Sequence, residues 1–178
     1  MHNGLPIKLR ISRNSTGMTL CIVGMGGTGK AVAKRAQSLR MTIIYHNRHR
    51  IPNQIVKQHP YLKAARYTTS LDELLEISKV VSIHVPLLPE TTCLIYKEHF
   101  QRMKTGSYLV NTSRRPVVDE QALANVLKLG QTGGAGLEVF ENEPKVHPGL
   151  LNDMNVTLMP HLGAFTIETL TRMETLAM

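Results

Sequence analysis

The chain has 178 residues, of which 42% are hydrophobic and 19% charged, and it has no tryptophan. This length suits one domain, and the composition excludes a disordered chain. No apolar run reaches the roughly 20 residues that a bilayer needs, so a membrane protein is excluded too. The two cysteines, Cys21 and Cys93, are too few for a disulfide-stapled miniprotein and lack the spacing of metal ligands, so no metal is expected. Residues 1–4 open without the apolar segment of a secretion signal, and we expect a cytoplasmic protein.

The net charge of +8 is unevenly distributed. Residues 1–71 contain 12 lysines and arginines and no acid, whereas all 13 aspartates and glutamates lie in residues 72–178. A basic half indicates an anionic partner, which could be a nucleic acid, a lipid surface or a phosphate-rich small molecule. Composition does not choose among these three.

Short apolar runs alternate with amphipathic stretches along the chain. Strands are predicted, in chain order, at 18–23, 41–46, 65–67, 80–85, 108–112, 136–140 and 156–160. Helices are predicted at 31–39, at 71–77, through Phe100 and Met103, at 119–129 and from 166 onward. A capping box of Ser70 and Glu73 precedes the second of these helices. Residues 47–60 are predicted to form a loop that contains one helical turn. Strands and helices that alternate in this way predict an α/β fold of the Rossmann type, a doubly wound parallel sheet with helices on both faces.

Residues 24–29 (GMGGTG) follow the first predicted strand and match G-x-G-x-x-G. Gly24 allows the tight turn, Gly26 lets the backbone approach a pyrophosphate, and Gly29 lets the helix pack on the strand. The N–H groups and the positive dipole end of the helix then face the phosphates. We therefore assign residues 24, 26, 27, 28 and 29 (Gly24, Gly26, Gly27, Thr28 and Gly29) to cofactor binding. The alternative is a glycine turn that only packs a helix closely.

The residues after the second predicted strand indicate which dinucleotide fits. An NAD site has Asp or Glu there to hold the ribose 2′-hydroxyl, but residues 46–50 (HNRHR) contain no carboxylate. A guanidinium suits a 2′-phosphate. We therefore expect NADP(H) as the preferred cofactor, with Arg48 as its main contact and Asn47 assisting, and NAD(H) as the alternative. Arg48 and Arg50 could instead be ordinary solvated loop charges.

Six motifs follow one another in the chain: VGMGG (23–27), IYHNR (44–48), HVPLLPET (84–91), VNTSR (110–114), GLEVFENEP (136–144) and PHLGA (160–164). Through them, residues 16–170 resemble the D-isomer-specific 2-hydroxyacid dehydrogenases, especially the fungal glyoxylate and hydroxypyruvate reductases. The resemblance implies hydride transfer from nicotinamide C4 to a small 2-oxo acid, and a homodimer formed through the cofactor domain. It divides the chain into a leader (1–17), a dinucleotide-binding domain (18–165) and the start of a return helix (166–178).

The resemblance also implies three catalytic residues. Arg114 matches the arginine that binds the substrate carboxylate, His161 matches the proton donor, and Glu143 matches the partner that favours the charged imidazole. Further residues are implied at the cofactor: Val85, Pro86, Thr112, Ser113 and Glu138. The histidines at positions 59, 84, 99 and 147 are expected to be structural, although His84 should lie near the nicotinamide.

The chain departs from the family pattern at three positions. Arg115 and Arg40 stand where the family has glycine, and Glu138 stands where it has aspartate. If the backbone of Arg115 requires a positive φ, strain there could displace Arg114. The family also has a substrate domain that we do not find in the sequence, so we expect the chain to bind NADPH weakly and to turn over little.

Two other classes of function compete with a reductase. One is a non-catalytic NAD(P)-binding module, such as a corepressor-like sensor or an inactive paralogue. The other is a nucleic-acid-binding protein that uses the basic first 71 residues. No aromatic platform interleaves those charges, so neither a nucleic-acid nor a membrane partner is expected.

Overall fold

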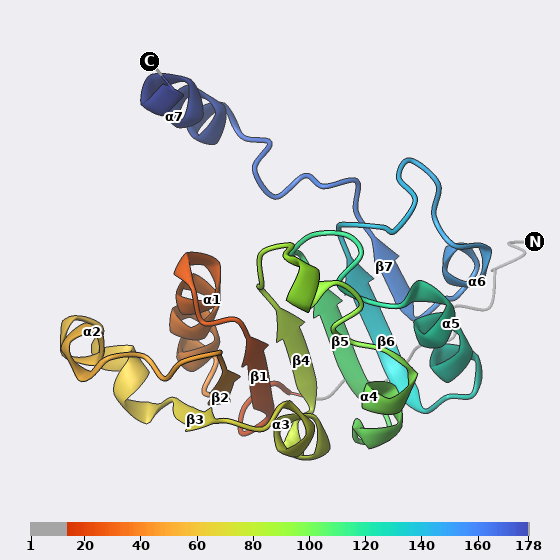
Figure 1. Cartoon of the computed structure of the whole chain (residues 1–178), viewed down its shortest axis with the longest axis horizontal. Helices are drawn as coiled ribbons and strands as arrows, with labels where there is room; N and C mark the ends of the chain where they lie inside the picture. Colours follow the sequence, from red (N-terminus) through yellow and green to blue (C-terminus); the bar gives the residue numbers. More distant parts are fainter. Residues whose placement is uncertain (1–13, 178) are drawn as a thin grey trace, which may run out of the picture.

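Seven parallel strands form one sheet in the order β3-β2-β1-β4-β5-β6-β7 (Figure 1). The computed structural model describes residues 14–177, so most of the predicted leader lies outside the described residues. The strands are β1 (Thr19–Val23), β2 (Thr42–His46), β3 (Arg66–Thr68), β4 (Val80–Ile83), β5 (Ser107–Asn111), β6 (Thr132–Leu137) and β7 (Val156–Leu158). This architecture confirms the predicted Rossmann-type parallel sheet.

Helices alternate with these strands, as expected. They are α1 (Gly27–Ser38), α2 (Asn53–Gln58), α3 (Leu71–Ile77), α4 (Lys97–Arg102), α5 (Glu120–Lys128), α6 (Pro148–Leu151) and α7 (Ile167–Ala177), with short 3₁₀ helices η1 (Pro60–Ala64) and η2 (Pro89–Thr91). In the part of the chain that the structure describes, no helix is long and apolar enough to cross a membrane.

Two apolar clusters lie on opposite faces of the sheet. Alternate residues of β1 show the division, because Leu20 and Ile22 belong to one cluster and Cys21 and Val23 to the other. The first cluster packs against α1, and the second, larger one packs against α3, α4 and α5. The sheet is therefore buried on both sides near β1, which is typical of parallel sheets.

Among the predicted boundaries that were wrong are the end of β4 and the start of β6, and one short helix was missed. β4 ends at Ile83 and not at 85, because the N–H of His84 makes the last bond to β1, to the carbonyl of Val23 (2.8 Å). β6 begins at Thr132, four residues before the predicted start, in a run of glycines that carries no apolar pattern. The short helix α6 was not predicted.

The capping box before α3 is half confirmed. The Ser70 hydroxyl accepts a hydrogen bond from the N–H of Glu73 (3.1 Å), as predicted. The Glu73 carboxylate does not return to the N–H of Ser70, because it accepts the hydroxyl of Thr68 (2.8 Å) and Thr68 accepts the Ser70 N–H (3.2 Å). Thr68, at the end of β3, therefore ties the strand to the helix start.

Helix α7 confirms the expected helix from residue 166 onward, and it stands apart from the sheet (Figure 1). Its side chains Ile167 and Leu176 are exposed. The loop that leads to it, which follows β7, carries one of the predicted catalytic residues.

Candidate functional site

A cleft opens where the order of the strands reverses, between β1 and β4. The chain moves outward from β1 to β3 and then returns to β4 on the other side of β1, so the carboxyl ends of β1 and β4 lie side by side. Open α/β sheets bind ligands at this switch point. The cleft has a volume of about 700 Å³. Among its lining residues are Gly24, Gly26, Asn47, Arg48, His84, Val85 and Pro86.

The glycine turn forms one wall of this cleft, and its glycines have different roles. Gly24 has φ +96°, and a Cβ there would lie 2.7 Å from the carbonyl oxygen of His84. A Cβ on Gly29 would overlap the carbonyl oxygen of Gly24. At Gly26 and Gly27, in contrast, a Cβ would meet no atom within 4 Å. The first two glycines are therefore required by the fold, and the other two leave open space beside the backbone.

The start of α1 offers free donors at that open space. Gly26 is the N-cap, no side chain caps the helix, and the first turn contains no acidic residue. Gly26, Gly27 and Thr28 are exposed. The first-turn N–H groups and the positive end of the helix dipole can therefore receive a diphosphate, and the residues present fit a dinucleotide.

Asn47 has a different contact from the one expected. Its Oδ1 accepts the N–H of Met25 (2.6 Å), so the side chain braces the glycine turn from the end of β2. It lines the cleft, but its oxygen is already used by the protein. Arg48 is exposed and also lines the cleft, whereas Arg50 is exposed and does not. Of these two arginines, Arg48 is thus the one beside the cleft.

His84 is a cleft residue that we expected to be structural. Its Nε2 lies 2.8 Å from the Ser82 hydroxyl, while its Nδ1 is buried and has no hydrogen-bond partner. Burial lowers the pKa of His84 from 6.5 to about 4, so the ring is neutral at pH 7. From the sequence we also expected His84 near the nicotinamide, and the structure shows it directly after β4, lining the cleft at the sheet edge where ligands bind.

A second cleft, of about 490 Å³, lies beside the ends of β6 and β7. It brings together three of the predicted residues, namely Glu138, Glu143 and His161. His161 is exposed and has φ +53°, and its N–H donates to the carbonyl of Met159 (3.0 Å). Within residues 14–177, no group of three or more His, Cys, Asp or Glu could hold a metal ion.

The residues after β5 are held by local hydrogen bonds. The N–H and hydroxyl of Ser113 both donate to Oδ1 of Asn111 (3.1 and 2.6 Å), which leaves Ser113 buried. Thr112 is half-buried beside it. Arg114 is exposed, and its Nη1 donates to the carbonyl of Ser113 (2.6 Å). This arginine does not line the cleft of Glu143 and His161.

Glu143 has other partners in this structure than the predicted His161. Oε1 of Glu143 accepts the N–H of Phe140 (3.1 Å), and Oε2 forms an ion pair with Nη2 of Arg115 (3.5 Å). Both carboxylate oxygens are thus engaged by other groups. No local pattern in the sequence signalled this arrangement.

Backbone strain is also located elsewhere than expected. Among the described residues other than glycine, positive φ values occur at Arg40 (56°), Cys93 (49°) and His161 (53°). Arg115 is not among them, so its side chain imposes no strain of this kind on Arg114. Arg40 takes the left-handed conformation just after α1, the place at a helix end where glycine is usual.

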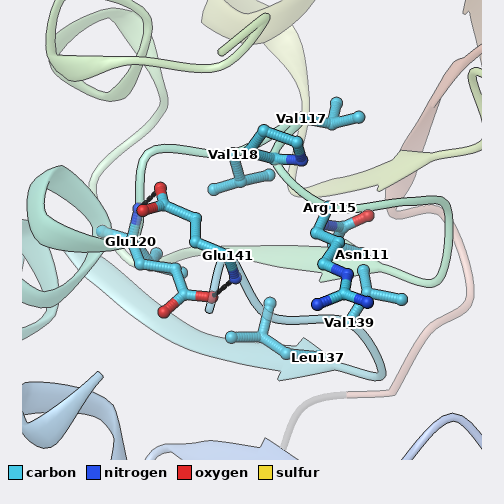
Figure 2. Close-up of a pocket in the computed structure, with 10 residues that line it drawn as sticks. Asn111, Arg115, Val117, Val118, Glu120, Leu137, Val139 and Glu141 are labelled. Carbon is cyan, nitrogen blue, oxygen red and sulfur yellow. Dashed lines mark hydrogen bonds between the residues drawn. The ribbon is translucent and has the colours of Figure 1, made fainter. Parts of the chain in front are cut away.

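A small pocket under the Arg115 loop contains two glutamates that bind each other's backbone (Figure 2). The N–H of Glu120 donates to Glu141 (2.9 Å) and the N–H of Glu141 donates to Glu120 (2.7 Å). Glu120 is 5% exposed, and burial raises its pKa; the charge of Glu141 raises it further. These bonds join the start of α5 to the loop after β6.

Comparisons with known proteins agree with this geometry. The sequence profile of the NAD-binding domain of the D-isomer-specific 2-hydroxyacid dehydrogenases matches residues 7–163. The chain belongs to this family. Its cofactor class is therefore a nicotinamide dinucleotide.

Individual relatives show how much of the family's length the chain covers. A 4-methyl-2-oxopentanoate reductase A of Aspergillus oryzae is 41% identical over 94% of this chain and 49% of its own length. A crystal structure of a glyoxylate reductase from Paecilomyes thermophila superposes with a TM-score of 0.88 at 42% identity, over 95% of this chain and 49% of that one. A D-lactate dehydrogenase from Aquifex aeolicus, solved with NAD and lactic acid, gives 0.82 at 32% identity, over 94% of this chain and 53% of that one. The chain spans about half the length of these relatives.

Proposed function

We propose that the chain is the coenzyme-binding part of an NADPH-preferring reductase of small 2-oxo acids, of the glyoxylate or hydroxypyruvate class. The observation that carries this proposal is the open space at Gly26 and Gly27, where the uncapped start of α1 faces a cleft lined by Arg48. A dinucleotide needs donors for its diphosphate and, for NADP, a cation for its 2′-phosphate, and both lie on this cleft.

The proposed chemistry divides among three residues. When bound, the dinucleotide supplies the hydride for the 2-oxo carbon. Arg114 binds the substrate carboxylate by a bidentate ion pair, which requires its guanidinium to leave the carbonyl of Ser113. His161 donates the proton that the forming alkoxide needs, and Glu143 stabilises the charged ring, which requires its carboxylate to leave Arg115.

Parallel titrations of the chain with NADPH and NADH test the cofactor preference. We expect NADPH to bind more tightly, and Arg48→Asp to reverse the preference by about tenfold or more, because it replaces a cation at the 2′-phosphate by an anion. Arg50→Asp is the matched control, since it makes the same charge change outside the cleft. Tighter binding of NADH by the unmutated chain would contradict the proposal, as would equal effects of the two substitutions.

Gly26→Ala tests the diphosphate site itself. Its Cβ meets no protein atom within 4 Å, so we expect an unchanged free energy of unfolding. The methyl group would occupy the space of the diphosphate, and both dinucleotides should bind about tenfold more weakly. Calorimetric titration and urea unfolding measure the two effects. Unchanged affinity would place the diphosphate elsewhere.

The second candidate function is a non-catalytic NAD(P)-binding module. The engagement of Glu143 by Arg115, and of Arg114 by Ser113, favours it, because neither side chain is arranged around His161. Oxidation of NADPH in the presence of glyoxylate or hydroxypyruvate distinguishes the two. A reductase shows consumption that Arg114→Gln lowers at least tenfold, whereas a module binds NADPH and consumes none.

Two further parts of the proposal concern assembly and location. We propose a homodimer formed through this domain, and a cytoplasmic setting. Sedimentation at several protein concentrations tests the dimer.

A further inference from the structure

Arg115 lies near three glutamates and forms an ion pair with one of them. A surface hollow of about 1,030 Å³ beside the loop is lined by Arg115 together with Glu120, Glu141 and Glu143. The ion pair that Arg115 forms is with Glu143, at 3.5 Å between Nη2 and Oε2. Arg115 is thus near several acids and neutralises one in particular.

The other two glutamates are already occupied by each other's backbone. Figure 2 shows the Arg115 side chain beside Asn111 and Val139, on the opposite side of the pocket from the Glu120 and Glu141 carboxylates. Glu120 and Glu141 each accept the other's N–H. Each of these two glutamates thus binds backbone at the start of α5 or in the loop after β6 with one oxygen, and the guanidinium on the other side of the pocket pairs with Oε2 of Glu143 instead.

The choice of Glu143 matters because this residue shares the second cleft with His161. The titratable side chains that line this cleft are Glu138, Glu143 and His161. Glu143 has both oxygens engaged, by Phe140 and by Arg115. A cation paired with Glu143 reduces the negative charge that His161 experiences, so the charged imidazole gains less from this carboxylate.

We propose that Arg115 is a positioning residue that sets the proton affinity of His161 by holding Glu143. This inference rests on the proposed roles of Glu143 and His161. Arg115 touches neither substrate nor cofactor in this scheme and acts through Glu143. Without Arg115, the Glu143 carboxylate turns towards His161 and stabilises its charged form.

NMR titration of the histidine side chains tests this directly on the chain, with the His161 signals assigned from a His161→Gln variant. For Arg115→Gln we expect the titration midpoint of His161 to rise by a few tenths of a pH unit, since His161 is exposed and solvent screens its interaction with the freed carboxylate. Arg115→Lys should restore the original midpoint. Arg102→Gln removes the same charge from an exposed pair with Glu76 and should change nothing at His161.

A cycle with Glu143→Gln separates the indirect effect from simple charge removal. Arg115→Gln takes away a positive charge, which by itself raises the midpoint of any nearby histidine. If Arg115 acts through Glu143, most of the shift disappears in the Glu143→Gln background. An unchanged His161 midpoint in Arg115→Gln, or an equal shift in both backgrounds, overturns the inference. Circular dichroism confirms that each variant is folded.

The result of the Arg115 and Glu143 cycle can be told apart from the results of the NADPH binding and consumption experiments. If the cycle gives the expected coupling but NADPH does not bind, Arg115 still positions Glu143 and the reductase proposal fails. If NADPH binds and consumption depends on Arg114 while the cycle shows no coupling, the reductase proposal stands and the role of Arg115 is refuted.

Discussion

The two clefts of this domain are built in different ways. The cleft between β1 and β4 is formed by backbone in close contact: Gly24 lies against the carbonyl of His84, and Gly29 lies against Gly24. The cleft beside β6 and β7 depends on exposed or half-buried side chains, and Glu143 has partners other than the predicted one. Backbone contacts permit one arrangement, whereas side-chain ion pairs at a surface contribute little and can exchange partners. The shape of the first cleft is thus fixed by backbone packing. In the second cleft, one substitution can change which charged side chains pair.

Gly29→Ala should produce the largest loss of stability, because its Cβ would overlap the carbonyl oxygen of Gly24. We expect the free energy of unfolding to fall by roughly 2–3 kcal/mol, the upper part of the range for overpacking substitutions. Gly27→Ala is the matched control, since its Cβ meets nothing within 4 Å and alanine favours the helix. Urea unfolding measures both. Similar values for the two variants would show that the first cleft is not held by close packing.

His84, which lines the first cleft, should make the free energy of unfolding of the chain depend on pH. Its folded-state pKa of about 4 lies below the ordinary 6.5, so the folded chain binds this proton less readily than the unfolded chain. The contribution of neutral His84 to the free energy of unfolding is therefore fully present above pH 6.5 and is lost as the pH falls towards 4. Allowing for partial exposure, the loss between pH 7.5 and 4.5 is on the order of 2 kcal/mol.

His84→Gln should remove that loss, because glutamine does not gain a proton. The exposed His49→Gln is the control and should leave the pH dependence of unfolding as it is. If His84→Gln and the unmutated chain lose equal stability on acidification, the histidine is not held neutral by burial.

Arg40→Gly should stabilise the chain by about 0.5–1 kcal/mol. Arg40 has φ +56°, which costs an L-residue energy that glycine avoids. Arg115→Gly makes the same chemical change at a position without a positive φ and should bring no gain. Thermal unfolding of the two variants measures the difference. A gain in Arg115→Gly alone would mean that strain lies in the Arg115 loop after all.

Glu120→Gln should have the smallest effect and the opposite pH dependence to His84. Burial raises the pKa of Glu120, so the folded chain holds this proton more tightly, and stability falls as the pH rises through the raised pKa. Glutamine can still accept the Glu141 N–H without a charge, so we expect a gain of less than about 1 kcal/mol at pH 7 and none at pH 4. Unfolding at the two pH values checks this, and a loss at pH 7 would contradict it.

Much of the first cleft could be predicted from the sequence. The glycine spacing, the strand before it and the helix after it depend on local conformational preferences, and these identified Gly24 and Gly29 correctly as structural requirements. The role of Asn47 was missed because its contact with Met25 spans 22 residues and needs β1 and β2 side by side. The neutral state of His84 was missed because it depends on burial.

The amino-acid sequence by itself determined the fold class, the order of the elements and the position of the glycine turn, since each follows from apolar periodicity and from where glycine is needed. Only the tertiary structure decided which groups pair in the second cleft. Arg115 and Glu143 lie 28 positions apart, and their ion pair exists because the loops after β5 and β6 meet at a hollow where Arg115 lies near three carboxylates and pairs with one of them. Partner choice among charged side chains depends on that competition in space, which no local pattern contains.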